Sequence, residues 1–361
     1  PELLQPWRLP NRWQDQPPPE GGPVDPDPVD PGVPLPGPCG QRSGLPWASG
    51  VSPGTGVGAK ALVNVTGFGT WRGRPADVAA VFIGKNSWTA GYDDFLTNPV
   101  LGPEGAVRQL SQHGICPVLT VPLVTSADFM RFDKVAAGGI DREHQRIAAK
   151  IQDAVAGGTI YLRLGHEADE GYPWSYTNQG RPAADPGQYR AAWRRIATIY
   201  RHAVPSARIV WNVLKNTRLK ISDYYPGDDV VDVISIDVYD NGHGGYCDAA
   251  NSPGWLNYCH GDYHAGSGVS KGINGILQFA RQHGKRIAVD EWGATNDSLT
   301  AGNGANNPFF VAGMHDFFAA NANSIEYESY FNRAGGGRHQ IWPKTSYNPL
   351  PSDAYLARYR D

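Results

Sequence analysis

The sequence has few charged residues and no long apolar run, and both absences exclude classes of protein. Only 19% of its 361 residues are charged, and the formal net charge is −3. Because the chain shows no basic stripe, neither nucleic acid nor an anionic membrane surface is an expected partner. No segment approaches the about 18 consecutive apolar residues of a membrane-spanning helix, so no membrane span is predicted.

Cysteine is also scarce, and its spacing is informative. The four cysteines, Cys39, Cys116, Cys247 and Cys259, include no C-x-x-C pair. This usage is typical of an exported protein with two disulfides. We expect Cys247–Cys259, which closes one loop, and by elimination Cys39–Cys116. The alternative is a zinc site, because His243, His260 and His264 lie near two cysteines, although their spacing matches no common zinc pattern.

Two further absences concern the ends and the motifs of the chain. It starts at PELLQPWRLP, without Met or a signal-type apolar segment, and we interpret it as the mature or trimmed form of a longer, secreted or cell-surface protein. No G-x-S-x-G or strand-linked G-x-G-x-x-G motif occurs, so a serine nucleophile and a dinucleotide are not indicated. No cofactor or metal is expected, and a monomer is expected.

Proline and glycine are abundant in residues 1–55. The run PPPEGGPVDPDPVDPGVPLPGPCG cannot form a helix or a central strand and predicts an extended, polyproline-like arm or linker. The free tether is one interpretation. Trp7, Trp13 and Trp47, with Cys39 as an anchor, favour an arm that packs across the main domain.

From residue 56 to residue 361, short β-branched runs alternate with amphipathic segments. Strands that alternate with helices predict a parallel sheet, and this number of strands predicts a (β/α)8 TIM barrel, an α/β fold. The candidate strands are Leu62–Gly67, Val78–Ile83, Cys116–Val121, Thr159–Leu164, Ile209–Val213, Val233–Val238, Ile287–Asp290 and Ile325–Phe331. The candidate helices are Asp141–Ala156, Pro186–Val204, Asn274–His283 and Pro308–Ala320. Thr70–Asp77 is too short for a crossover helix, so either the first helix is a turn or one of the first two strands is misplaced.

Two of these strands end on a glutamate. GTIYLRLGHEAD contains Glu167 after the fourth strand, and RIAVDEWGAT contains Glu291 at the seventh. Carboxylates at the C-terminal ends of parallel strands face the mouth of a barrel. Two of them on different strands provide what glycoside hydrolysis needs, a proton donor together with a nucleophile or base.

Other polar and aromatic residues lie near these strand ends. Tyr239, which shares a strand face with Ser235 and Asp237, could donate a hydrogen bond to a neighbouring carboxylate. Asn212 ends the fifth strand, where it would contact a sugar hydroxyl or cap the backbone. Arg163 shares the parity of Glu167 and would orient a carboxylate, or form a structural ion pair in the barrel.

The chain is rich in aromatic residues, with 11 Trp and 17 Tyr. Trp174 and Trp292 follow the two glutamates and are candidates for stacking on sugar rings. His166 directly precedes Glu167 and is a candidate substrate contact, with a buried core histidine as the alternative. The long segment Asn241–His264, which carries Tyr246 and Trp255, is expected to form one wall of a substrate cleft, or else a surface loop stabilised by its own aromatics.

The order RLGHEAD, VDVISIDVYD and AVDEWGAT resembles glycoside hydrolase family 26. This resemblance implies a retaining (β/α)8 glycosidase with Glu167 as acid/base and Glu291 as nucleophile. It also implies substrate-site roles for His166, Trp174 and Tyr239. The resemblance covers residues 56–361, and departs from the family's pattern after Glu167 and in the long 241–264 segment.

The resemblance implies a secreted endo-β-glycanase, with β-1,4-mannan as the first expected substrate. β-1,3-Xylan, mixed-linkage β-1,3-1,4-glucan and an exopolysaccharide are the alternatives. A barrel that binds polysaccharide without cleaving it is the alternative from another class, although it would have no need of both carboxylates.

Overall fold

The computed structural model describes residues 39, 41–53, 60–84, 103–177, 181–215, 217, 219–240, 255–264, 269–296, 306–335 and 338–360. Within these residues eight parallel strands close into a barrel in the order β1-β10-β9-β6-β5-β4-β3-β2, which confirms the predicted (β/α)8 fold. The strands are β1 (Ala48–Ser52), β2 (Val78–Phe82), β3 (Cys116–Val121), β4 (Ile160–Leu164), β5 (Ala207–Leu214), β6 (Val233–Tyr239), β9 (Arg286–Gly293) and β10 (Ile325–Phe331).

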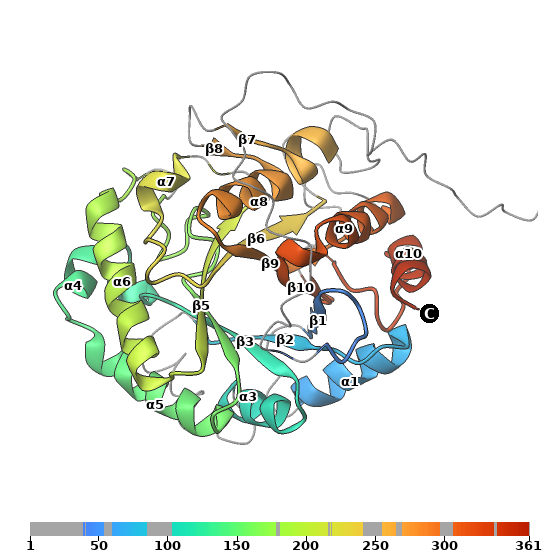
Figure 1. Ribbon diagram of the computed structural model, residues 1–361, viewed down its shortest axis with the longest axis horizontal. Helices are drawn as coiled ribbons and strands as arrows, with labels where there is room; N and C mark the ends of the chain where they lie inside the picture. The colour runs from blue at the N-terminus through green and yellow to red at the C-terminus, as the bar shows by residue number, and fades with distance from the viewer. Residues whose placement is uncertain are drawn as a thin grey trace, which may run out of the picture. The chain divides into compact units, whose positions relative to one another are not determined.

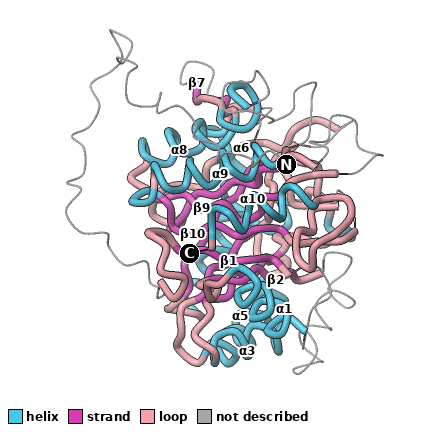
Figure 2. Tube along the Cα trace, turned by 90° about the vertical axis from the view of Figure 1, so that its right-hand side faces the viewer, coloured by secondary structure: helices cyan, strands magenta, loops and turns pink. Residues whose placement is uncertain are grey.

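Helices surround the barrel in Figure 1, and Figure 2 shows several of them lying over the strands from the side. The longer helices are α1 (Lys60–Arg72), α3 (Pro103–Gln112), α5 (Asp141–Val155), α6 (Pro186–Ala203), α8 (Gly272–Gln282), α9 (Pro308–Ala320) and α10 (Pro349–Tyr359). The shorter elements are α4 (Phe132–Ala136), α7 (Ile221–Tyr224), β7 (Tyr263–His264), β8 (Val269–Ser270), two 3₁₀ turns (Ser126–Asp128 and Ala322–Ser324) and a π-helical turn (Trp255–His260). Asp185 accepts a hydrogen bond from the Gln188 N–H and Pro186 begins α6, as the capping pattern predicts.

One predicted strand is wrong, and its replacement lies in the predicted arm. Leu62–Gly67 belongs to helix α1, whose buried residues Ala61, Val65, Phe68 and Arg72 follow helical spacing. The first barrel strand is β1, before residue 56. A β-carbon at Gly50 would lie 2.0 Å from the Val78 carbonyl oxygen, so β1 needs a glycine to approach β2. The short 70–77 connection therefore joins a helix to β2.

The interior of the barrel changes from apolar to polar along the strands. Alternation places Val233, Ser235 and Asp237 of β6 on the inner face. The inner residues near the strand N-termini form a small apolar cluster that includes Val78, Val118, Tyr161, Val210, Val233 and Ala288. The next inner layers carry buried polar groups, among them Thr120, Arg163, Asn212, Ser235, Asp237 and Asp290. The larger apolar core lies between the strands and the helices. Polar chemistry is thus concentrated toward the C-terminal ends of the strands.

A disulfide joins Cys39 to Cys116 at the start of β3, as expected. Cys259 is buried, but Cys247 lies outside the described residues, so the second bridge stays a prediction. Residues 1–38, with Trp7 and Trp13, and Tyr246 also lie outside them. None of the helices that the structure describes has the length and apolar character that crossing a membrane requires.

An ion cluster around a buried glutamate at the N-terminal end of the barrel allows a test of stability. Glu326 of β10 is 2% exposed and lies 3.2 Å from both Arg208 and Arg286. Tyr161 donates a 2.9 Å hydrogen bond to it. Glu326→Ala would leave the buried Tyr161 hydroxyl without its acceptor and two partly exposed guanidiniums without their shared partner. We therefore expect urea denaturation to show a loss of about 2 kcal/mol in unfolding free energy.

The matched control is Asp353→Ala, which removes an exposed ion pair with Lys344. Exposed pairs contribute about 0–1 kcal/mol, so this variant should unfold close to the wild type. Equal losses in the two variants would contradict a special role for the cluster around Glu326.

Candidate active site

Glu291 reaches the barrel interior because β9 contains a bulge. The register pairs Ile236 with Val289 but Asp237 with Glu291, so one extra residue is inserted on β9. A bulge turns a side chain that strict alternation would send to the other face. Asp290 and Glu291 both contact inner-face groups, whereas Trp292 packs outward.

The Glu291 carboxylate is held from two sides. Arg163 of β4 donates to Oε1, and the Tyr239 hydroxyl donates to Oε2 at 2.7 Å. The predicted hydrogen bond from Tyr239 is therefore present. Arg163 is 0% exposed and also forms an ion pair with Asp237 at 3.0 Å, so this one side chain contacts two carboxylates. This arrangement fixes the direction of the carboxylate in the barrel mouth.

Glu167, which follows β4, has an unusual backbone conformation. Its φ is +47°, in the left-handed region that a non-glycine residue adopts at an energetic cost. Its N–H donates to Asn212 Oδ1 at 2.6 Å, and its carbonyl accepts from the Ser175 hydroxyl at 3.0 Å. Asn212 is fully buried among protein partners, which places it in the capping position that the sequence allowed rather than on exposed surface.

The electrostatic surroundings of the Glu167 side chain favour the protonated form. Burial, together with the nearby charge of Glu291, raises the pKa of Glu167 from 4.5 to about 8. Tyr172 lies within hydrogen-bonding reach of its carboxyl group. Sequence reasoning missed Tyr172, although its position five residues after Glu167 in an aromatic segment was an available signal. The charge of Glu291 thus acts on Glu167, and the two glutamates have different environments.

This shift predicts a pH dependence of stability. Glu167 binds its proton more tightly in the folded than in the unfolded protein, so its contribution is complete below about pH 4.5 and is lost toward about pH 8. Glu167→Gln stays neutral at every pH. We expect the difference in thermal midpoint, variant minus wild type, to increase between about pH 4.5 and about pH 8 and to stay constant above that. A difference independent of pH would contradict the shift.

Two more carboxyl groups lie below the pair. Asp237 and Asp290 are buried beside Arg163. Burial raises the pKa of both, and the charge of Glu291 adds to this, while Arg163 acts in the opposite direction. The inward position of Asp237 follows from the predicted parity of β6. Because Ala288 faces inward and side chains alternate along β9, the sequence could also have predicted that Asp290 faces inward.

The predicted sugar-stacking tryptophans do not face solvent. Trp174 is 0% exposed and packs against Tyr172, with ring centroids 5.0 Å apart. Its indole N–H donates to the His166 carbonyl at 2.6 Å. Trp292 is also 0% exposed and donates to Glu328 at 2.6 Å, on the side of the helices. Their large apolar area is used in packing, so the expectation that they present open faces is not met.

The other two aromatic candidates, Trp255 and His166, differ in exposure. Trp255 is 2% exposed, and its ring lies against Gly313 of α9, so it attaches its segment to α9 rather than presenting a ring to a cleft. This segment also contains the π-helical turn Trp255–His260, whereas residues 241–254 of the predicted cleft wall lie outside the described residues. The His166 ring is partly exposed and packs beside Tyr172 and Trp174.

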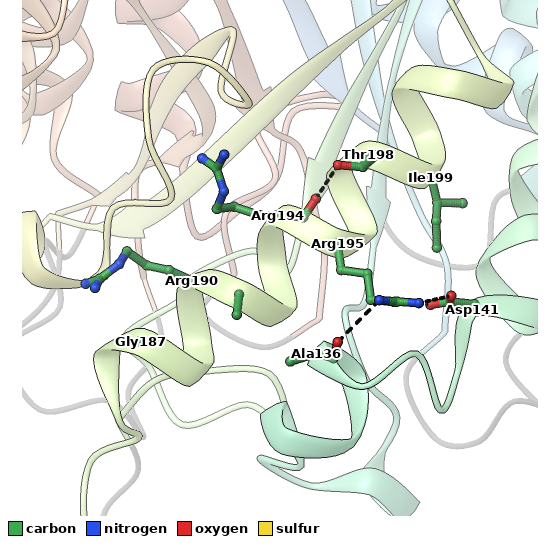
Figure 3. A pocket seen from close by; sticks show the side chains of 9 residues that line it. Ala136, Asp141, Gly187, Arg190, Arg194, Arg195, Thr198 and Ile199 are labelled. Atoms are coloured by element: carbon green, nitrogen blue, oxygen red, sulfur yellow. Dashed lines mark hydrogen bonds and ion pairs between the residues drawn. The ribbon is translucent and has the colours of Figure 1, made fainter.

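A hollow of about 700 Å³ on the outer side of α6 does not have the chemistry of this site (Figure 3). Arginines dominate its rim, but they are already paired. Arg195 makes a two-pronged contact with Asp141, and Arg194 makes another with Asp229. These paired guanidiniums connect α6 to Asp141 of α5 and to Asp229.

Comparisons with known proteins show which proteins this chain resembles. The model of glycosyl hydrolase family 26 matches residues 133–278, which include Glu167 and Tyr239. A mannan endo-1,4-beta-mannosidase of Bifidobacterium adolescentis is 26% identical over 72% of this chain and 25% of its own length. The chain therefore spans about a quarter of that relative.

Solved structures show the same fold. GH26C from Muricauda sp. has a TM-score of 0.59 at 16% identity, with 87% of this chain and 85% of that chain covered. The Bacillus subtilis mannanase BCman has a TM-score of 0.54 at 12% identity, with 86% and 85% covered. The solved structures share the (β/α)8 fold of this chain, and the family model and the curated relative show a similarity to glycoside hydrolases. The resemblance to family 26 that the strand-end motifs predict is confirmed.

Proposed function

We propose that this chain is a secreted, retaining endo-β-glycanase, with β-1,4-mannan as the first expected substrate. The observation that supports it most is the pairing of Glu291, held by Arg163 and Tyr239, with Glu167, whose pKa is raised. The names of the mannan-cleaving relatives support the substrate. The disulfide at Cys39 supports export, because disulfides persist in oxidising compartments.

In the first step, Glu291 attacks the anomeric carbon while Glu167 gives its proton to the glycosidic oxygen. The C–O bond to the leaving sugar breaks, and a covalent glycosyl ester forms on Glu291. Arg163 and Tyr239 orient the attacking carboxylate. A raised pKa keeps Glu167 protonated at the start of this step.

In the second step, the ionised Glu167 accepts a proton from water, and the water oxygen attacks the anomeric carbon. The ester bond to Glu291 breaks, which restores the carboxylate and the protonated Glu167. Two displacements at the same carbon retain its configuration. This mechanism requires the two carboxyl groups to be about 5–5.5 Å apart, a distance that a crystal structure of the protein would measure, and about 9 Å would instead indicate inversion.

The test of the proposed function is release of reducing sugar from a panel of β-linked polysaccharides. Mannan and glucomannan should be cleaved fastest, and NMR of early products should show retained anomeric configuration. Faster cleavage of β-1,3-xylan, mixed-linkage glucan or an exopolysaccharide would reassign the substrate. Binding without cleavage of any member, equal in the wild type and in Glu291→Gln, would favour a polysaccharide-binding barrel.

A further inference from the structure

A single buried amide connects the strand ends that carry the two glutamates. Asn212 Oδ1 accepts the Glu167 N–H at 2.6 Å. On its other side, Asn212 Nδ2 lies 3.2 Å from Asp290 Oδ2, and Asp290 directly precedes Glu291. Asn212 thus lies between the backbone of one glutamate and the bulge that presents the other.

The donors and acceptors around Asn212 define its orientation. Nδ2 faces acceptors only, namely Ser235 Oγ at 2.8 Å, Asp237 Oδ1 at 3.0 Å and Asp290. Ser235 in turn donates to Asp290 at 2.5 Å. Reversing the amide would set a carbonyl oxygen against two carboxylates and an N–H₂ against the Glu167 N–H. The amide therefore has one allowed orientation.

The left-handed backbone of Glu167 needs such a partner. A glutamate at φ +47° has no steric preference for this conformation, so the surrounding contacts must maintain it. Asn212 accepts its N–H from the barrel side, and Ser175 holds its carbonyl from the loop side. Both Asn212 and Ser235 are 0% exposed, which leaves no surface for a sugar to contact.

We propose that Asn212 is a positioning residue that fixes the separation of the Glu167 and Glu291 carboxyl groups. It does so by holding the Glu167 backbone and the Asp290 side chain at the two ends of one rigid amide. The proposal rests on the proposed function for its kinetic consequences, but its geometric consequence is independent of activity.

The principal test is Asn212→Ala, compared with Asn307→Ala. Asn307 is also buried, and its Oδ1 also accepts backbone N–H groups, those of Phe309 and Phe310 in α9. We expect Asn212→Ala to lower kcat about 10²-fold, because displacement by about 1 Å has that effect on aligned groups, with KM nearly unchanged. Asn307→Ala should lower stability and leave kcat near the wild-type value. Equal kcat losses, or a raised KM with unchanged kcat, would overturn the proposal.

A second pair of variants covers the case in which Asn212→Ala does not fold. Ser235→Ala removes one hydrogen bond at the donor end of Asn212, and we expect kcat to fall about fivefold. Ser49→Ala is the matched control, since this buried strand serine donates to Glu328, outside the network of Asn212. Similar kcat in the two variants would contradict the role of the amide.

Crystal structures of the same variants separate the failure of this proposal from the failure of the proposed function. Asn212→Ala and Ser235→Ala should move Glu167 out of the left-handed region. They should also change the separation of the Glu167 and Glu291 carboxyl groups, even if the protein is inactive on every polysaccharide. An unchanged φ and separation in Asn212→Ala would overturn the positioning role, whatever the wild type hydrolyses.

Discussion

Glu291→Ala is expected to lower kcat on the order of 10⁵-fold on polysaccharide and on activated aryl glycosides alike. The variant loses the group that attacks the anomeric carbon, and loss of a nucleophile has effects of this size in other hydrolases. Arg163 and Tyr239 would remain without the carboxylate that they hold. Single-turnover kinetics with both substrates, after circular dichroism has shown a folded barrel, would measure the loss.

The pKa of the leaving group should not change the loss in this variant, because every substrate needs the attack by Glu291 on its anomeric carbon. Glu291→Gln should behave in the same way while keeping the packing of the side chain. Turnover of the aryl glycoside by Glu291→Ala near the wild-type rate would show that Glu291 is not the nucleophile.

Glu167→Ala is expected to lower kcat on polysaccharide by about 10²–10⁴-fold, the usual contribution of a general acid. Hydrolysis of an aryl glycoside with a good leaving group should retain much of its first step, because that leaving group departs without a proton. Azide should then raise turnover, since a small anion can enter the vacated space and attack the glycosyl ester without base assistance.

The matched control is Glu170→Ala, which removes an exposed carboxylate three residues later and should change kcat less than twofold. The measurement is kcat for aryl glycosides of increasing leaving-group pKa, with and without azide. If Glu167→Ala and Glu291→Ala respond alike to the leaving group, the assignment of the two roles is wrong.

The errors in the sequence prediction have identifiable physical causes. Leu62–Gly67 has β-branched residues, yet it lies within helix α1, whose buried residues follow a helical stripe that the prediction overlooked. Strand β1 consists of small residues without a β-branched run, and its pairing with β10 and its close approach to β2 at Gly50 arise only in the folded barrel. The order of the strands was nevertheless correct, because the misplaced strand and β1 both precede β2.

The aromatic residues show a second limit of prediction from the sequence. Trp174, Trp255 and Trp292 lie beside the right segments, but local sequence does not specify which face of a loop meets solvent. The structure directs their rings into packing with Tyr172, α9 and the helix layer. Their burial depends on neighbours from distant parts of the chain.

The sequence alone determined the alternation of strands and helices, the two strand-end glutamates and the inward parity of Asp237, because periodicity and strand ends are local properties. Only the tertiary structure decided that Glu291 faces the interior, since this depends on a bulge between β6 and β9. The same is true of the Asn212 contacts and the raised pKa of Glu167. These properties arise from groups that are distant in sequence and meet only when the barrel closes.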